Sequence, residues 1–478
     1  MKKNNKIFKF DAILKEGKRN LSFLIFCFIL FGCKKLVHIP EPINTITSAE
    51  AFSTQANATS AIVGIYSGMS WSSGNRAYAN GEMSIIPGLS ADELSAFAGP
   101  NNGFYYFQQN LILSSYGECN NFFWRPIYSD IYKTNAAVEG IQASTTLSKS
   151  VKNQLTGEAK FIRAFCYFYL VNLFGDGPLD TTTAWAQTSL LAKAPTEKIY
   201  QQIVEDLKSA QQLLPEDYSI ANKERTRANR WAASAMLARV YLYQQQWAAA
   251  EEQSTQVINN SLYSLTTDLN SAFLKNNNEA IFQLELINNY PWATQEGNQL
   301  IPQDSTSSPV YCLTSQLLNA FEPSDKRRLA WVDSTHYSGV YYFYPYKYKV
   351  RQGTSGNISE YYTLLRLAEQ YLIRAEARIE QKNLVGGLQD LNTIRNRAGL
   401  MDLSDSLNPA QCLAALAQER RIELFSEWGH RWFDLKRTGQ ADAILSLVKP
   451  QWKATAKLYP IPLSEIQLDP NLKQNPGY

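Results

Sequence analysis

The sequence predicts a mainly α-helical fold in which paired helices form the scaffold, a few short strands are added, and loops rich in aromatic residues form one face. Two observations support this prediction. Long stretches carry apolar residues at the three- and four-residue spacing of an amphipathic helix. Between them lie segments rich in glycine, asparagine and aromatic residues that show no sustained period. Long loops in compact domains are usually functional.

The amino-terminal segment indicates export and lipid attachment. Seven basic residues precede the apolar run at residues 21–30, which is too short to span a bilayer. Cys33 directly follows Gly32, and several lipid chains on one cysteine give durable membrane anchoring. We therefore predict a lipoprotein signal peptide at residues 1–32, lipidation of Cys33 and a tether at residues 33–50. The alternative is an ordinary cleaved signal with a chance cysteine.

The charge balance argues against a nucleic-acid partner. The chain of 478 residues has a net charge of +3, but residues 1–32 carry seven Lys/Arg and two Asp/Glu, so the remainder has a net charge of −2. No strong field is left to hold a polyanion such as nucleic acid. No later apolar stretch is long enough to cross a membrane.

Four cysteines besides Cys33 follow the predicted cleavage point, and their spacing argues against a metal cluster. They are far apart and form no CxxC pair. Export permits disulfides, and the sequence leaves open whether any form. Cys166 lies in a very apolar segment, where a buried, inert thiol is expected. The four are Cys119, Cys166, Cys312 and Cys412.

Four helices are predicted in the first half of the chain. The third is the most apolar and requires cover from other helices. The segment Gly175–Pro178 ends it, and Thr196 is predicted to cap the next helix. Residues 70–110 show no period and are predicted to form a long loop region. The four helices cover residues 48–66, 122–141, 155–174 and 196–214.

A pair of consecutive helices is predicted twice in the second half. Residues 227–246 and 247–258 form the first pair, and residues 361–382 and 384–397 form the second. Aligning the two pairs sets Ala238 against Ala375, Ala250 against Gly387 and Val257 against Ile394. Small residues at such points let helices approach closely, as in tetratricopeptide-type hairpins. The strict consensus is absent, so two unrelated hairpins remain an alternative.

The remaining segments are assigned more coarsely. Residues 260–358 look irregular, apart from a short strand at 279–286 and an alternating tyrosine-rich stretch at 341–348. Helix resumes at residues 409–437, and the chain closes in an extended, proline-rich tail.

Catalysis receives little support, and we predict no catalytic residue, cofactor or metal ligand. The chain has three histidines and lacks the common hydrolase, phosphate-binding and metalloprotease motifs. Adjacent Asp92 and Glu93 do not flank one bond as a glycosidase pair must, so an anchoring role is favoured. The charged stretch 419–437 is expected to hold helices together, with Trp428 and Trp432 as packing residues.

Two aromatic loops are the best candidates for ligand binding. Aromatic rings stack on the apolar faces of sugars, while amide and charged side chains bond the hydroxyl groups. Both residue types lie close together at residues 101–106 and 288–292. The alternative is that these rings fold back as satellite cores. The predicted ligand-binding residues are Asn101, Asn102, Phe104, Tyr105, Tyr106, Tyr290 and Trp292.

Four stretches, in chain order, carry recognisable motifs. They are Cys33 followed by Phe52 and Ala61-Ile62-Val63-Gly64-Ile65-Tyr66; Gly157-Glu158-Ala159-Lys160-Phe161 through Gly175-Asp176-Gly177-Pro178; Leu372-Ile373-Arg374-Ala375-Glu376 through Glu419-Arg420-Arg421-Ile422-Glu423-Leu424 and Gly429-His430-Arg431-Trp432-Phe433-Asp434-Leu435; and Leu458-Tyr459-Pro460 to Asn475-Pro476-Gly477-Tyr478. Together they resemble the SusD/RagB family of outer-membrane nutrient-binding lipoproteins of Bacteroidetes. Lys34-Lys35 stand after Cys33, where acidic residues would mark surface export.

The resemblance implies a scaffold of tetratricopeptide-like helical pairs with a loop-rich ligand face over residues 51–478. Its amino-terminal part would cover residues 51–220 and its carboxy-terminal part residues 221–478. In family members with known glycan contacts, aromatic residues come from regions that correspond here to 104–106 and 290–292.

The family resemblance also implies a function. The protein would not be an enzyme. It would be anchored by lipid in the outer membrane, facing the cell surface, and would capture an oligosaccharide or other nutrient for a SusC-like TonB-dependent transporter. Two alternatives stay open: a helical scaffold that docks the transporter without a glycan ligand, and a surface glycoside hydrolase.

Overall fold

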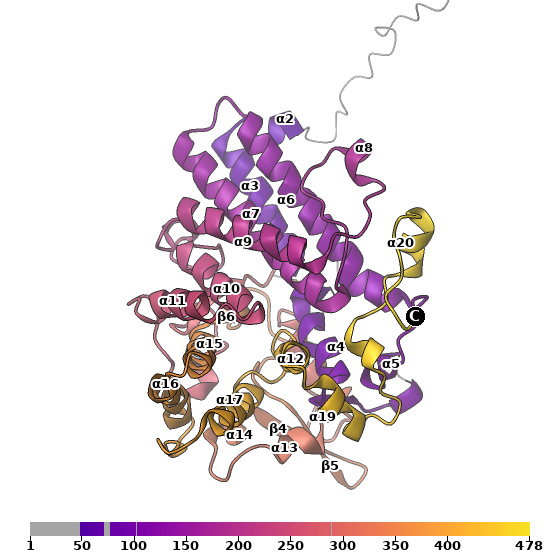
Figure 1. Cartoon of the computed structure of the whole chain (residues 1–478), viewed down its shortest axis with the longest axis vertical. Helices are drawn as coiled ribbons and strands as arrows, with labels where there is room; N and C mark the ends of the chain where they lie inside the picture. Colours follow the sequence, from indigo (N-terminus) through magenta and orange to yellow (C-terminus); the bar gives the residue numbers. More distant parts are fainter. Residues whose placement is uncertain (1–47, 71–76, 102, 288) are drawn as a thin grey trace, which may run out of the picture. The chain divides into compact units, whose positions relative to one another are not determined.

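The amino-terminal helices pack around α7 (Lys149–Phe174). The computed structural model describes residues 48–70, 77–101, 103–287 and 289–478, so the predicted signal peptide, Cys33 and residues 34–47 lie outside the described residues. Every residue of α7 from Phe161 to Val171 is buried, because α3, α6 and α9 cover it (Figure 1). The flanking helices are α2 (Ser48–Ala51), α3 (Gln55–Ser70), α6 (Arg125–Ala143) and α9 (Thr196–Leu213).

The start of α9 differs from the prediction that Thr196 caps it. Thr196 already lies inside the helix, and the residue before it is Pro195, whose side chain cannot accept a hydrogen bond. Asp176 takes the capping role instead: its carboxylate accepts from the backbone N–H and the hydroxyl of Thr196, both at 2.8 Å. The turn that ends α7 therefore also fixes the start of α9.

The prediction of a long loop at residues 70–110 is wrong for much of that segment. Within it, the structure has a π-helical segment η1 (Tyr78–Glu82) followed by α4 (Met83–Ser90), and every residue of both is buried. A helix buried on all sides has no polar face, so it shows no amphipathic period in the sequence. Pro87 inside α4 weakens the helical signal further.

Paired helices form the second half of the scaffold, as predicted. Successive contacts join α10 to α11, α11 to α15, α15 to α16 and α16 to α17 (Figure 1). A Cβ atom at Gly387 would lie 2.5 Å from Ile379 Cγ1, so the absence of a side chain permits this close approach. The pairs are α10 (Arg230–Tyr243) with α11 (Trp247–Ile258), and α15 (Leu367–Glu380) with α16 (Leu384–Arg397), followed by α17 (Pro409–Glu423).

Three two-stranded antiparallel sheets are present in the described part of the chain. β2 (Ala280–Leu284) pairs with β6 (Tyr362–Arg366), so the predicted helix at 361–382 begins only at Leu367. All five residues of β6 are buried, which hides the alternation that marks a half-exposed strand. The other sheets pair β1 (Leu94–Ala96) with β3 (Tyr311–Leu313), and β4 (Val332–Tyr337) with β5 (Val340–Pro345).

The predicted helix at 409–437 is interrupted. α17 ends at Glu423 and α18 (His430–Arg437) begins seven residues later. Ser426, Trp428 and Gly429 have φ values of 52°, 46° and 70°, which turn the chain so that the Trp428 ring enters the core. Trp428 and Trp432 are both buried, which confirms their predicted packing role.

Short helices complete the structure. They are α5 (Tyr105–Gln108), α8 (Trp185–Thr188), α12 (Gln295–Leu300), α13 (Ser315–Leu318), α14 (Lys326–Ala330), α19 (Ala441–Val448) and α20 (Leu463–Leu468), with the further segments η2 (Gly99–Asn101), η3 (Cys119–Trp124), η4 (Ser219–Ala221), η5 (Leu269–Ser271) and η6 (Ala454–Lys457). Among the helices described, none combines the length and apolar character needed to cross a membrane.

Two glycines test the helical packing. Alanine at Gly140 in α6 would place a Cβ atom on the ring of Phe52, so we expect the free energy of unfolding to fall by about 1–3 kcal/mol. Alanine at Gly64 in α3 meets no atom within 4 Å, and we expect it to stabilise the protein by about 0.5–1 kcal/mol through helix propensity. Urea unfolding followed by circular dichroism measures both. Equal effects of the two substitutions would contradict the packing of Phe52 on α6.

Candidate functional site

The first predicted ligand loop follows β1 and runs into α5, whose first two residues are Tyr105 and Tyr106. Asn101 ends the short helical segment η2, and Asn102 lies outside the described residues. The side-chain Oε1 of Gln108 in α5 accepts a hydrogen bond from the backbone N–H of Ala96, at 2.9 Å. This bond ties the far end of the loop back to β1.

The rings of this loop are not equally open. Phe104 packs against Phe107, Phe122 and Tyr311, with ring centroids 5.9–6.4 Å apart. Tyr105 and Tyr106 are half-buried. The Tyr106 ring lies 4.7 Å from that of Tyr116. Phe104 therefore packs against the main hydrophobic core beneath the loop, and the two tyrosines are the outer part of this segment.

The second predicted loop presents an aromatic pair. The rings of Tyr290 and Trp292 lie 5.7 Å apart and nearly perpendicular, at 83°. Tyr290 is 58% exposed and Trp292 is half-buried. The N–H of Gly353 donates to the Pro291 carbonyl at 2.9 Å, and a Cβ atom at Gly353 would overlap the Trp292 carbonyl oxygen. Because residue 353 has no side chain, its segment can lie directly against the backbone of Pro291 and Trp292.

Both regions are joined to the β1–β3 sheet, the first through β1 and the second through β3. α5 contacts β1, which pairs with β3, and α12, which follows Trp292 by three residues, also contacts β3. Thr294 caps α12 by accepting from the Gly297 N–H at 3.1 Å. The two predicted regions, separated by almost 200 residues in the sequence, thus belong to one neighbourhood of the fold.

A third aromatic group was not predicted. Phe97, directly after β1, lies edge-on to Tyr337 and Tyr342 of the β4–β5 hairpin, with ring centroids 5.8 and 5.0 Å away. The alternation at residues 341–348 predicted a strand, which β5 confirms. Nothing in a single sequence connects that strand to Phe97, because the contact spans more than 200 residues.

The adjacent acids Asp92 and Glu93 are held by the scaffold. Asp92 accepts from Arg421 and from Arg431, each at 2.7 Å. Burial opposes its charge, but the two arginines outweigh burial and hold its pKa below the usual value. Burial, with repulsion from Asp92, raises the pKa of Glu93 to about 8. These contacts support the predicted anchoring role of the pair.

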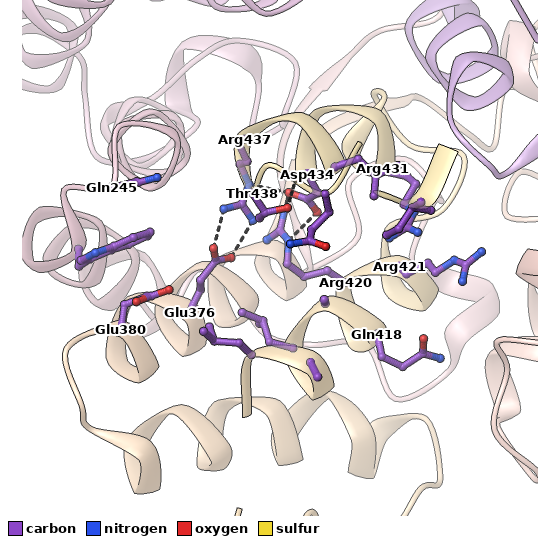
Figure 2. A pocket seen from close by; sticks show the side chains of 18 residues that line it. Gln245, Glu376, Glu380, Gln418, Arg420, Arg421, Arg431, Asp434, Arg437 and Thr438 are labelled. Atoms are coloured by element: carbon purple, nitrogen blue, oxygen red, sulfur yellow. Dashed lines mark hydrogen bonds and ion pairs between the residues drawn. The ribbon is translucent and has the colours of Figure 1, made fainter. Parts of the chain in front are cut away.

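The charged stretch 419–437 lines a cavity of about 740 Å³ between α15, α17 and α18 (Figure 2). Its charged side chains are mutually paired. Asp434 accepts from Arg420 at 2.8 Å and from Arg437 at 2.7 Å, and Arg437 also donates to Glu376 at 2.5 Å. Both acids and both arginines are thereby neutralised, so this cavity offers no unbalanced charge from these four residues.

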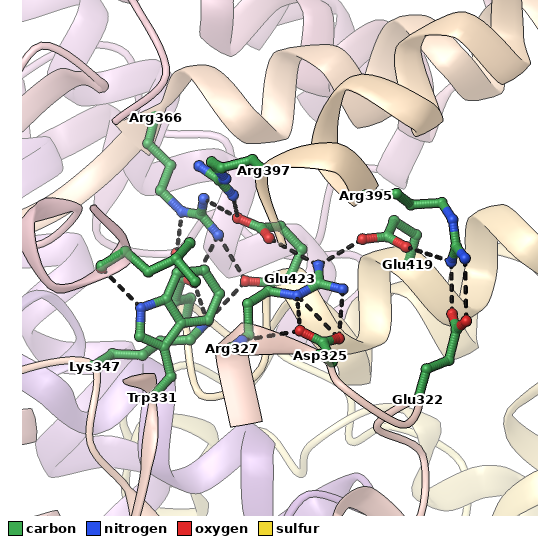
Figure 3. A network of polar contacts seen from close by, with 12 residues as sticks. Glu322, Asp325, Arg327, Trp331, Lys347, Arg366, Arg395, Arg397, Glu419 and Glu423 are labelled. Atoms are coloured by element: carbon green, nitrogen blue, oxygen red, sulfur yellow. Dashed lines mark hydrogen bonds and ion pairs between the residues drawn. The ribbon is translucent and has the colours of Figure 1, made fainter. Parts of the chain in front are cut away.

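A second network is buried at the other side of α17 (Figure 3). Glu423 accepts from Arg366 at 2.6 Å, from Arg327 at 3.0 Å and from Arg397. Burial opposes the Glu423 charge, but the arginines hold its pKa well below the usual range. Arg327 is also enclosed by Asp325 and Glu419. These ion pairs agree with the prediction that the charged stretch holds helices together.

The cysteines described are free thiols, and Cys119, Cys166 and Cys412 are buried. Burial raises the pKa of Cys166, which agrees with an inert thiol. Within residues 48–70, 77–101, 103–287 and 289–478, no group of three or more His, Cys, Asp or Glu residues is placed to hold a metal ion.

Two family models match the chain. One, described as starch-binding associating with outer membrane, covers residues 53–242, and the other, described as SusD family, covers residues 240–478. SusD-like protein P25 of Formosa agariphila is 25% identical over 96% of this chain and 99% of its own length. Starch-binding protein SusD of Bacteroides thetaiotaomicron is 34% identical over 24% of this chain and 21% of its own length.

Solved structures share the fold. A laminarin binding SusD-like protein superimposes with a TM-score of 0.74 at 24% identity, covering 88% of this chain and 99% of its own. Surface glycan-binding protein A from Bacteroides fluxus gives a TM-score of 0.73 at 23% identity, covering 89% and 100%. The predicted mainly helical, tetratricopeptide-like scaffold is confirmed.

Glu423→Gln tests the buried network. Removing one charge leaves three arginines without their shared carboxylate, so we expect the free energy of unfolding to fall by about 3–5 kcal/mol. The matched control is Glu216→Gln, whose pair with Arg230 is exposed and should change stability by no more than about 1 kcal/mol. Denaturant unfolding measures both, and comparable small effects would contradict a stabilising role for the network.

Glu93→Gln tests the buried acid. The folded-state pKa of about 8 lies above the unfolded value of about 4.3, so the fold retains a proton that the unfolded chain releases. This contribution to stability is complete below the unfolded pKa and is lost as pH rises towards 8. We expect Glu93→Gln to lose less thermal stability than the wild type between pH 5 and pH 8.5. The exposed control Glu205→Gln should follow the wild type; parallel curves for all three would contradict the assignment.

Proposed function

The chain belongs to the SusD/RagB family of Bacteroidetes, and on that premise we propose that it is a surface lipoprotein that captures an oligosaccharide and passes it to a SusC-like TonB-dependent transporter. The family models and the relatives' names support a carbohydrate ligand, since they include starch-binding, laminarin binding and glycan-binding proteins. This is a binding family rather than an enzyme family, so we propose no catalytic step.

The exposed aromatic pair Tyr290 and Trp292 is the observation on which the proposed site depends. Two rings at 83° offer one flat face and one edge, which suits a sugar ring stacked on the face and held at its rim. Tyr105 and Tyr106, at the start of α5, are proposed to extend this surface, and Asn101 and Asn102 to supply hydrogen bonds. Phe104 is proposed to support the loop from beneath, because its ring packs on three others.

Lipidation of Cys33 would hold this surface at the outer membrane. The description of the first family model, which associates the family with the outer membrane, supports this location. Several acyl chains on one residue give durable attachment without a membrane-spanning helix.

A second candidate is a scaffold that docks the transporter without its own glycan. The packed ring of Phe104 favours it, since one predicted contact residue is already satisfied within the protein. On this hypothesis, the transporter co-purifies with the protein while no polysaccharide retains it.

Affinity electrophoresis in gels that contain laminarin or starch tests the proposed site. Truncation of a central aromatic contact is expected to raise the dissociation constant at least about tenfold for Tyr290→Ala and for Trp292→Ala. The matched control is Trp185→Ala in α8, where the ring is 78% exposed and remote from β3 in the contacts described; its retention should equal that of the wild type. Unchanged retention of both loop variants would remove the site assignment.

A further inference from the structure

The two faces of the β4–β5 hairpin differ in how far other residues of the protein pack against them. Its register pairs Thr335 with Tyr342 and Tyr337 with Val340, so these four residues share one face. Phe97 covers the two tyrosines, and the Thr335 hydroxyl donates to the Ser307 carbonyl at 2.7 Å. At Thr335 and Tyr342 this inner face is turned towards the rest of the protein, whereas Tyr337 and Val340 at the end of the hairpin stay partly exposed.

The opposite face, which we call the outer hairpin face, consists of His336, Tyr341, Ser334 and Phe343, with Arg328 of α14 beside them. His336 and Tyr341 are direct cross-strand partners whose rings lie 4.6 Å apart, tilted by 39°. The Arg328 guanidinium lies over the Phe343 ring, 4.7 Å from its centroid. Tyr341 is 65% exposed, His336 is exposed and Phe343 is half-buried.

The spacing of these groups matches an extended ligand. Tyr341 and Phe343 lie two residues apart on one face of β5, which separates them by about 7 Å along the strand. Because Arg328 lies over the Phe343 ring, that ring is covered, and the guanidinium takes its place in the row next to Tyr341. An exposed ring beside a cation suits a charged sugar, which presents a flat C–H face and an oxyanion.

Arg328 differs sharply from its neighbour in the same helix. Arg327 forms ion pairs with Asp325, Glu419 and Glu423. Arg328 forms no ion pair with any residue that the structure describes, and burial lowers its pKa. A half-buried guanidinium without a carboxylate partner is available to bind an oxyanion with its planar array of donors.

We propose that the outer hairpin face binds a polysaccharide that carries carboxylate or sulfate groups. Tyr341 lies beneath a sugar ring, and Arg328, which is held over the Phe343 ring, binds an oxyanion. This inference extends the proposed function, because it adds a second surface and a charged ligand class to the loop site at Tyr290 and Trp292. It depends on the loop site only for the general assumption that the ligand is a glycan.

The test compares three gels for affinity electrophoresis, which contain alginate as a polyuronate, carrageenan as a sulfated galactan, and laminarin as a neutral glucan. The variants are Tyr341→Ala, Arg328→Gln and Arg328→Lys. The matched controls are Tyr132→Ala, an exposed tyrosine in α6, and Lys208→Gln, an exposed lysine in α9. Circular dichroism and thermal unfolding confirm that each variant is folded.

We expect Tyr341→Ala and Arg328→Gln each to weaken binding of at least one anionic polysaccharide by about fivefold or more, with laminarin binding unchanged. Arg328→Lys should retain part of the affinity, and added salt should weaken the wild type more than Arg328→Gln, since the charged contact is screened. Whether alginate or carrageenan responds identifies carboxylate or sulfate as the group recognised.

Three results would overturn the proposal. The first is a wild type that binds laminarin but neither anionic polysaccharide, which leaves the proposed loop site intact. The second is anionic binding that Tyr341→Ala and Arg328→Gln do not change, even where Trp292→Ala abolishes it. The third is loss of transporter co-purification with unchanged polysaccharide binding, which would make the outer hairpin face a protein-docking surface.

Discussion

Glu423 lies where four parts of the chain meet. Its carboxylate accepts from Arg327 of α14, Arg366 at the end of β6 and Arg397 at the end of α16, while its own helix is α17. None of these segments is adjacent to another in the sequence except α16 and α17. The arginines can satisfy their donors only when all four segments are in place, because a buried charge without its partner is strongly unfavourable. The network therefore joins these four segments at one buried carboxylate.

The position of the ligand loops follows from this arrangement through α17 and α18. Arg421 of α17 and Arg431 of α18 both bind Asp92, which stands two residues before β1. β1 pairs with β3, α5 with Tyr105 contacts β1, and α12, which follows Trp292, contacts β3. Charge pairs within the scaffold thus determine where the aromatic side chains are presented, although none of those charges belongs to the proposed ligand surfaces.

Local patterns predicted those parts of the fold whose helices have one exposed face. The second helices of both pairs begin at Trp247 and Leu384, as predicted. Prediction failed where burial removed the pattern: α4 is buried on every side, and β6 was assigned to the following helix. The break after Glu423 depends on Trp428 turning into a core built from distant segments, so no local signal marks it.

The candidate site shows the same limit. Tyr290 and Trp292 were predicted because aromatic and amide side chains lie close together in one segment of the sequence, and their role in binding stays a prediction. The sequence did not predict that Phe97 or the outer hairpin face belongs to a site. Both depend on contacts between residues that are distant in the sequence or on opposite strands of a pairing. The predicted role of Phe104 as a contact residue stays untested, and its neighbours show how a loop aromatic can serve as internal support.

The close contact between Gly353 and the Trp292 backbone affects the affinity expected of the proposed site at Tyr290 and Trp292. A segment pressed against its neighbour, with the Thr294 cap immediately beyond it, has little conformational freedom left to lose. Ordering a flexible loop on binding typically costs free energy and so lowers the affinity for the ligand. At the proposed site this entropic penalty would fall mainly on the sugar chain, so stiff oligosaccharides should be favoured over flexible ones of the same composition.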